Sequence, residues 1–259
     1  EKIPIIKGLD LTNDVLQKAT DENKMMLIDI ETSNKCNINC KYCFRDIYGT
    51  KEALDKELPL SRRLQLIREA KELGCGTIKI TGAGEPFVDP NLWPMIEYAN
   101  KLGMWVMVFT NGSVIDKKMA QRLSKMNVSL IVKCNSFDKN KEDEMVGVKG
   151  YAEKRNKAIQ YLIDEGFNKT TPTRLGRDLV ITKINKDEVY DALRWCRKNN
   201  VFPMFRPLMP IGGAAKLTDW MMSKEETKAM YEKAREIDAK EFDLSYSLTL
   251  PYMGGVWCR

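Results

Sequence analysis

The 259-residue sequence contains no histidine. Histidine is the side chain that most often moves protons near neutral pH, and it is a frequent zinc ligand. Its absence excludes both roles. Any acid–base chemistry in this chain must therefore come from lysine, aspartate, glutamate, tyrosine or cysteine side chains.

Long apolar runs are also missing. No segment approaches the roughly 18 consecutive apolar residues that a membrane-spanning helix needs. The first residues, EKIPIIKGLD, lack the charged-then-apolar layout of a secretory signal, and they do not begin with methionine. We expect a cytoplasmic protein with no membrane partner, and we treat neither end of the sequence as a natural domain end.

Blocks of basic residues are absent as well. The chain has 42 Lys and Arg against 36 Asp and Glu, a net charge of +6, and the two signs are mixed along the sequence. This pattern indicates a solvated surface and gives little support to nucleic-acid binding. The length suits one large α/β domain or two small ones, either of which can bury a core.

The seven cysteines form an uneven set. Three lie within eight residues, and the others, Cys75, Cys134, Cys196 and Cys258, are scattered. A secreted disulfide framework would be shorter and more evenly spaced, so a metal site in a reduced compartment fits better. Cys75, Cys134 and Cys196 fall in or beside expected helices and strands, where small core side chains are typical.

Short β-rich runs alternate with helical stretches along the chain. We expect strands at 26–32, 77–81, 105–110, 129–135, 178–182, 202–207 and 243–250, and helices at 61–73, 91–102, 116–126, 151–165, 187–199 and 223–240. Because parallel strands need a crossover between them, this alternation predicts a parallel sheet with helices outside it.

About six such units are too few for a closed eight-stranded barrel. The fold class that we predict is therefore α/β, a partial (β/α)6 TIM-like barrel. Residues 1–25 would form an N-terminal extension, 26–222 the barrel, and 223–259 a C-terminal helix and strand. Ligands of such sheets bind at the carboxyl ends of the strands.

A cysteine-rich loop follows the first expected strand. Its sequence, ETSNKCNINCKYCFRD, has the spacing C-x3-C-x2-C at Cys36, Cys40 and Cys43. Three thiolates on one short loop can each bind one iron of a 4Fe–4S cluster, and no fourth ligand is obvious nearby. Zinc would want four ligands, usually in paired sets, and the polar loop argues against ordinary buried cysteines.

This loop resembles the signature of radical S-adenosylmethionine (SAM) enzymes, including the aromatic Tyr42 before the third cysteine. The resemblance covers residues 26–210. It implies that SAM chelates the open iron and that one electron cleaves it to methionine and a 5′-deoxyadenosyl radical. That radical would abstract hydrogen from a substrate.

Other segments support the resemblance. Residues 82–86, GAGEP, occupy the place of the family's G-G-E-P stretch, and Asn111 lies in a T-N-G motif after the third strand. Lys133 and Asn135 stand where members often have Ser-x-Asp, and Arg206 ends the sixth strand. The SAM-binding residues implied are Tyr42, Gly82, Ala83, Gly84, Glu85, Asn111, Lys133, Asn135 and Arg206. Arg206 could equally pair with an acidic side chain, and Lys133 could extend along the barrel rim.

The C-terminal Cys258 lies where the SPASM and Twitch subgroups begin an auxiliary-cluster domain, so it is a candidate ligand of a second iron–sulfur cluster; a structural thiol is the alternative. No single catalytic residue stands out. A small metabolite such as a sugar, cyclitol or nucleotide is the favoured substrate, and a modified peptide is the alternative. The expected electron donor is a flavodoxin or ferredoxin. A non-catalytic iron–sulfur electron carrier is the competing hypothesis.

Overall fold

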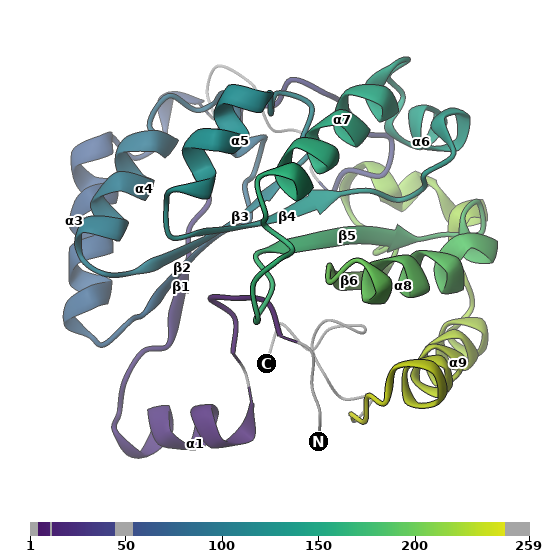
Figure 1. Cartoon of the computed structure of the whole chain (residues 1–259). Helices are drawn as coiled ribbons and strands as arrows, with labels where there is room; N and C mark the ends of the chain where they lie inside the picture. Colours follow the sequence, from purple (N-terminus) through teal and green to yellow (C-terminus); the bar gives the residue numbers. More distant parts are fainter. Residues whose placement is uncertain (1–4, 11, 45–53, 247–259) are drawn as a thin grey trace.

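A computed structural model describes residues 5–10, 12–44 and 54–246. Its centre is a six-stranded, fully parallel sheet with the strands in chain order. The strands are β1 (Leu27–Asp29), β2 (Thr77–Ile80), β3 (Trp105–Thr110), β4 (Val128–Lys133), β5 (Leu175–Ile181) and β6 (Phe202–Pro207). The sheet curls into a half-barrel with helices around its outside, as predicted (Figure 1).

The helices follow the expected alternation. They are α1 (Asn13–Asp21), α3 (Leu60–Glu72), α4 (Leu92–Lys101), α5 (Lys117–Ser124), α6 (Lys139–Val146), α7 (Tyr151–Asp164), α8 (Val189–Lys198) and α9 (Lys224–Phe242). Short 3₁₀ turns lie at Pro86–Val88, Lys186–Glu188, Gly212–Lys216 and Thr218–Trp220. None of the helices in the described ranges combines the length and apolar character needed to cross a bilayer.

The core lies between the sheet and its outer helices. Strand positions such as Val106, Val108, Leu130 and Val132 are almost fully buried. Near-continuous apolar strands are typical of parallel sheets that are buried on both faces. This packing fixes the strand ends, on which the loops of the site depend.

The N-terminal segment closes the amino-terminal end of the half-barrel. The Ile6 side chain is fully buried, and the Lys7 amide donates to the Thr173 carbonyl over 2.8 Å. The Lys7 carbonyl accepts from the Ser129 hydroxyl on β4 over 2.7 Å. Part of the expected extension therefore packs into the barrel floor.

Two elements differ from the prediction. Helices α1 and α6 were not expected. Helix α6 begins where the Asp138 carboxylate accepts from the Asn140 and Lys141 amides, and it ends at Gly147, whose φ is 76°. These are ordinary capping arrangements. Of the expected final strand at 243–250, residues 247–250 lie outside the described residues.

Candidate active site

The three clustered cysteines lie on the loop after β1, at the carboxyl end of the sheet. Cys36, Cys40 and Cys43 form no disulfide and are half-buried, and the Cys43 amide donates to the Cys40 carbonyl over 3.1 Å. Burial, together with the charges of Cys43 and Cys36, raises the pKa of the Cys40 thiol to about 12. The three thiols therefore lie close enough to act on one another.

This donor set fits a cubane cluster. In the described ranges, no group of three or more His, Cys, Asp or Glu side chains could hold a single metal ion. A 4Fe–4S cluster does not require such convergence, because each thiolate binds a different iron. The positive charge of Lys133 opposes the rise in the pKa of Cys40.

The cysteine loop is anchored on both sides. The Gly213 amide donates to the Cys43 carbonyl over 2.8 Å, and a Cβ at position 213 would lie 3.0 Å from the Lys41 oxygen. Tyr42 is only 7% exposed, and its hydroxyl accepts a hydrogen bond from the Asn135 amide over 2.8 Å. The loop is thus held by residues that follow β6 and β4.

The Gly82–Glu85 stretch packs directly against the start of this loop. The Gly84 amide donates to the Ser33 carbonyl over 2.7 Å, and the Glu85 amide donates to the Lys35 carbonyl over 2.8 Å. A Cβ at position 84 would lie only 1.8 Å from the Lys35 oxygen. The resemblance implied that Gly84 binds SAM. In the structure, the lack of a side chain at Gly84 makes room for the backbone of the cysteine loop.

Gly82 is required for a different reason. Its φ is +67°, a left-handed conformation that side chains disfavour, and a Cβ would lie 2.6 Å from the Gly84 oxygen. The neighbouring Ala83 is buried. The turn after β2 therefore has a fixed shape before any ligand binds.

The Glu85 carboxylate joins the turns after β2 and β3. It accepts from the Thr110 hydroxyl over 2.6 Å, from the Asn111 amide over 2.6 Å and from the Phe87 amide over 3.1 Å. The side chain is 2% exposed, and this burial raises the pKa of its carboxyl to about 7, against the effect of the three donors. Glu85 is therefore a structural link between two of the predicted SAM motifs.

Asn111 continues this link to the cysteine loop. Its side-chain amide donates to the Asn37 side chain over 2.9 Å, and its side-chain oxygen accepts from the Ser113 amide over 2.8 Å. Asn37 also donates to the Ser113 hydroxyl over 2.8 Å. The turn after β3 and the cysteine loop are thereby fixed to one another.

Asn135 is fully buried and bonded within the protein. Besides its bond to Tyr42, its side-chain amide donates to Glu142 over 3.2 Å, and its side-chain oxygen accepts from the Val180 amide over 3.0 Å. These partners use the polar atoms of the side chain. Asn135 therefore links β4, β5 and the cysteine loop, and its role toward SAM stays a prediction.

Lys133 and Arg206 meet at Asp178, a residue that the sequence analysis did not select. Arg206 donates to both carboxylate oxygens of Asp178, over 3.1 and 2.7 Å, and Lys133 forms an ion pair with the same group. Burial opposes ionisation, but the charges of Arg206 and Lys133 outweigh it and hold the pKa of Asp178 at about 2. The position of Asp178 within a buried strand is the sequence feature that could have marked it as a partner of these cations.

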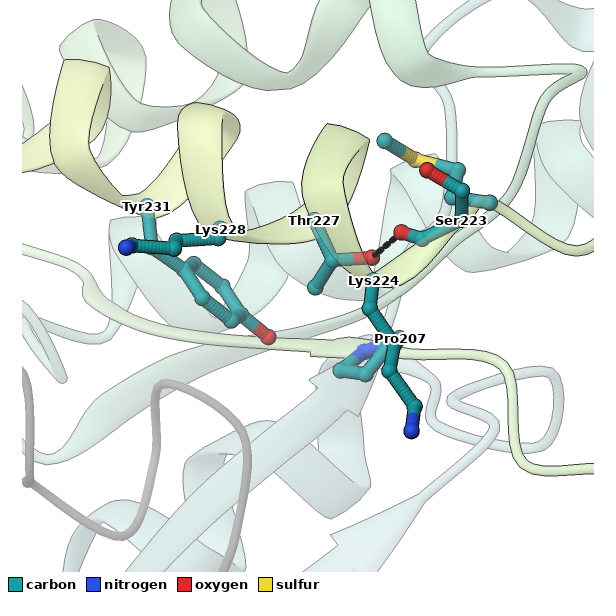
Figure 2. Close-up of a pocket in the computed structure, with 7 residues that line it drawn as sticks. Pro207, Ser223, Lys224, Thr227, Lys228 and Tyr231 are labelled. Carbon is teal, nitrogen blue, oxygen red and sulfur yellow. Dashed lines mark hydrogen bonds between the residues drawn. The ribbon is translucent and has the colours of Figure 1, made fainter.

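A cavity of about 430 Å³ lies apart from the cysteine loop, between the end of β6 and the first turns of α9 (Figure 2). It is lined by Pro207, Met222, Ser223, Lys224, Thr227, Lys228 and Tyr231. Ser223 caps α9 by accepting from the Glu226 amide. The remaining predicted site residue, Cys258, lies outside the described residues.

A parallel half-barrel with a three-cysteine loop at its carboxyl edge is the architecture of iron–sulfur enzymes that act on SAM. Comparison of the sequence with protein families gives the same class. The family model of the Radical SAM superfamily matches residues 30–196, so the chain belongs to this superfamily. Its members use a 4Fe–4S cluster and SAM.

The individual proteins that resemble this chain share only about a quarter of the aligned residues with it. GTP 3′,8-cyclase of Clostridium perfringens (strain SM101) is 27% identical over 195 residues, which are 72% of this chain and 56% of that protein. Fe-coproporphyrin III synthase of Methanosarcina barkeri is 23% identical over 239 residues, 90% of this chain and 57% of that protein. The chain thus spans little more than half the length of these relatives.

Solved structures show the same fold. The crystal structure of Streptococcus suis SuiB bound to the precursor peptide SuiA has a TM-score of 0.70 and 18% identity, covering 89% of this chain and 53% of that one. The AdoMet-bound structure of anSMEcpe has a TM-score of 0.64 and 15% identity, covering 85% and 59%.

Proposed function

We propose that this chain is the catalytic barrel of a radical SAM enzyme, with Cys36, Cys40 and Cys43 as the three protein ligands of a 4Fe–4S cluster. The observation that carries this proposal is the position of the three thiols on a single anchored loop at the carboxyl edge of the sheet. When bound, the cluster supplies the electron that cleaves SAM to methionine and a 5′-deoxyadenosyl radical, which takes hydrogen from a substrate.

The chain's own residues hold the loop and shape the SAM site. Glu85 fixes the turn after β2 to the turn after β3, and Asn111 fixes the latter to the cysteine loop. These contacts support a site that is formed before SAM enters, in which Gly82 and Ala83 present backbone groups and the Glu85 and Asn111 side chains serve as positioning groups.

We further infer a small-molecule substrate. The relatives that support this are a GTP 3′,8-cyclase and a Fe-coproporphyrin III synthase, each aligned over most of this chain. The likeness to the peptide-bound SuiB concerns the fold, at 18% identity, and a modified peptide is the second candidate substrate. Because the cluster is oxygen-sensitive, we place the enzyme in the cytoplasm. Because the cluster needs an electron to cleave SAM, we propose a flavodoxin or ferredoxin as its donor.

The test is anaerobic. The protein is reconstituted with iron and sulfide, reduced with dithionite and given SAM, and 5′-deoxyadenosine is measured by mass spectrometry. The wild type should form it and Cys40→Ala should not. Cys196→Ala, which removes a buried thiol from α8, is the matched control and should retain iron and activity. A loaded cluster without deoxyadenosine in the wild type would instead support an electron carrier.

A further inference from the structure

Strands β4, β5 and β6 carry a charged group: Lys133 at the end of β4, Asp178 within β5 and Arg206 near the end of β6. We call Lys133, Asp178 and Arg206 the Asp178 group. Lys133 is paired with Asp178 in the register of β4 and β5, and Arg206 is paired with Val180 in the register of β5 and β6. The side chain of Asp178 is 3% exposed, while those of Lys133 and Arg206 are 20% and 39% exposed.

The charges of this group do not cancel. Two cations share one carboxylate, and in the described ranges neither cation forms an ion pair with a second acidic residue. Arg206 donates from its Nε and Nη2 atoms to Asp178. Its Nη1 atom forms no hydrogen bond to another described residue. Lys133 also faces the charge of a Cys40 thiolate, so the partly buried cation that an added anion would complete is chiefly Arg206.

The position of the group relates it to the reaction. The Lys133 ammonium lies 5.9 Å from the centre of the Tyr42 ring, on the loop that carries the cysteines. The segments that we assign to the SAM site, Gly82–Glu85 and Asn111, follow β2 and β3, in the other half of the sheet. A molecule held by the Asp178 group would therefore lie beside the cluster loop, on the half of the sheet away from those segments.

We propose that Arg206 and Lys133, oriented by Asp178, bind an anionic carboxylate or phosphate group of the substrate. This inference rests on the proposed function and names the substrate class of the same site. A guanidinium fork suits a planar or tetrahedral oxyanion, and an ammonium adds a point charge beside it. Asp178 keeps both cations in place when the site is empty and lowers the entropy lost on binding.

The carboxylate of SAM is a second possible source of the same chemistry, so the test separates the two. Binding of inorganic pyrophosphate and of succinate is measured by calorimetry on the reconstituted enzyme, without SAM and with saturating SAM. The proposal expects at least one probe to bind and SAM to leave its affinity within twofold. Displacement of both probes by SAM, or no binding of either, would overturn it.

Variants locate the binding. Arg206→Gln and Lys133→Gln should each weaken the probe at least tenfold and leave SAM affinity within twofold. Each variant leaves Asp178 with one cation, so folding is retained, which circular dichroism checks. Arg68→Gln, which removes an exposed cation from α3, should change neither affinity. Unchanged probe binding in both site variants, or a tenfold loss of SAM affinity, would contradict the assignment.

Deoxyadenosine formation by the same wild-type preparation separates this inference from the proposed function. Cleavage of SAM without Arg206-dependent probe binding would reject the anion site alone. Arg206-dependent binding without cleavage of SAM would reject the proposed function alone.

Discussion

The Glu85 carboxylate accepts hydrogen bonds from the Thr110 hydroxyl and the Asn111 amide, each over 2.6 Å. These two bonds join the ends of adjacent strands, β2 and β3, through a side chain that is almost completely buried. The turn that meets the cysteine loop and the turn that carries Asn111 therefore move as one unit.

Glu85 should make stability depend on pH. Its carboxyl has a pKa of about 7 in the folded chain, against 4.5 for an ordinary glutamate, so the unfolded state releases its proton more readily. The contribution of Glu85 to stability is thus fully present below pH about 4.5 and is lost as pH rises through about 7. The shift corresponds to a fall of about 3 kcal/mol across this window.

Chemical denaturation at a series of pH values measures this effect. Glu85→Gln cannot ionise and should not show this fall. It should also lose about 1–3 kcal/mol at low pH, because its NH₂ group would meet a backbone or hydroxyl donor. Glu72→Gln, at an exposed position on α3, should behave as the wild type. Identical pH profiles for Glu85→Gln and the wild type would contradict the prediction.

The close approach of Gly84 to Lys35 predicts a sharp difference between two glycines. A Cβ at Gly84 would overlap the Lys35 oxygen, whereas a Cβ at Gly76 has nothing within 4 Å. Gly84→Ala should therefore lower the free energy of unfolding by about 1–3 kcal/mol and reduce the iron bound per chain, because the cysteine loop must shift. Gly76→Ala should stay within about 0.5 kcal/mol of the wild type. Equal iron content and stability in the two variants would show that the loop adapts freely.

The buried bond between Tyr42 and Asn135 can be tested by two substitutions. Tyr42→Phe removes one hydrogen bond and should cost about 1 kcal/mol, while the cluster is retained. Asn135→Ala should cost more, about 2–4 kcal/mol, because the Val180 amide and Glu142 also lose a partner. Asn140→Ala, at an exposed position on α6, is the control. Thermal unfolding measures the stability of each variant, and iron analysis measures the cluster bound per chain. A larger loss of stability in Tyr42→Phe than in Asn135→Ala would contradict the prediction.

Two ion pairs between α8 and α9 differ in burial and should differ in effect. Asp238 is fully buried and accepts from Arg197 over 2.7 and 2.6 Å and from the Tyr246 hydroxyl over 2.6 Å. Asp238→Asn should cost about 3–5 kcal/mol, since it leaves a buried guanidinium without its counter-charge.

The comparison is the exposed pair of Arg194 and Glu241, whose side chains are 34% and 40% exposed. Glu241→Gln should cost less than about 1 kcal/mol. Urea denaturation of both variants gives the comparison, and similar losses would refute the assigned difference in burial.

Local patterns in the sequence predicted the strands, most helices and the cysteine loop. Near-continuous apolar runs mark β3 and β4 clearly, and the C-x3-C-x2-C spacing needs no structure to be seen. Helix α6 was missed because only two of its eight residues are apolar, Met145 and Val146, so no periodicity is visible. Its caps at Asp138 and Gly147 were the only local signal.

Contacts between distant residues could not be predicted. Asp178 is 45 positions from Lys133 and 28 from Arg206, and only the register of three strands brings them together. The resemblance implied that Gly84 binds SAM, and that stays a prediction; the close approach of the Lys35 oxygen to Gly84 is a property of the packed fold that the sequence does not reveal. The bonds of Asn135 to Tyr42 and Val180 likewise join residues 93 and 45 positions apart, which no local pattern predicts.

Strand β6 has a further consequence for how the molecule behaves among its own copies. In the described sheet it is an edge strand, and the Leu208 amide points inward, to the Ile181 carbonyl of β5. Backbone direction alternates along a strand, so the amides of residues 203, 205 and 207 face outward. Pro203 and Pro207 have no N–H, which leaves Phe205 as the donor in that row. A strand added along this edge of the described sheet would find few amide donors, a feature that opposes edge-to-edge pairing.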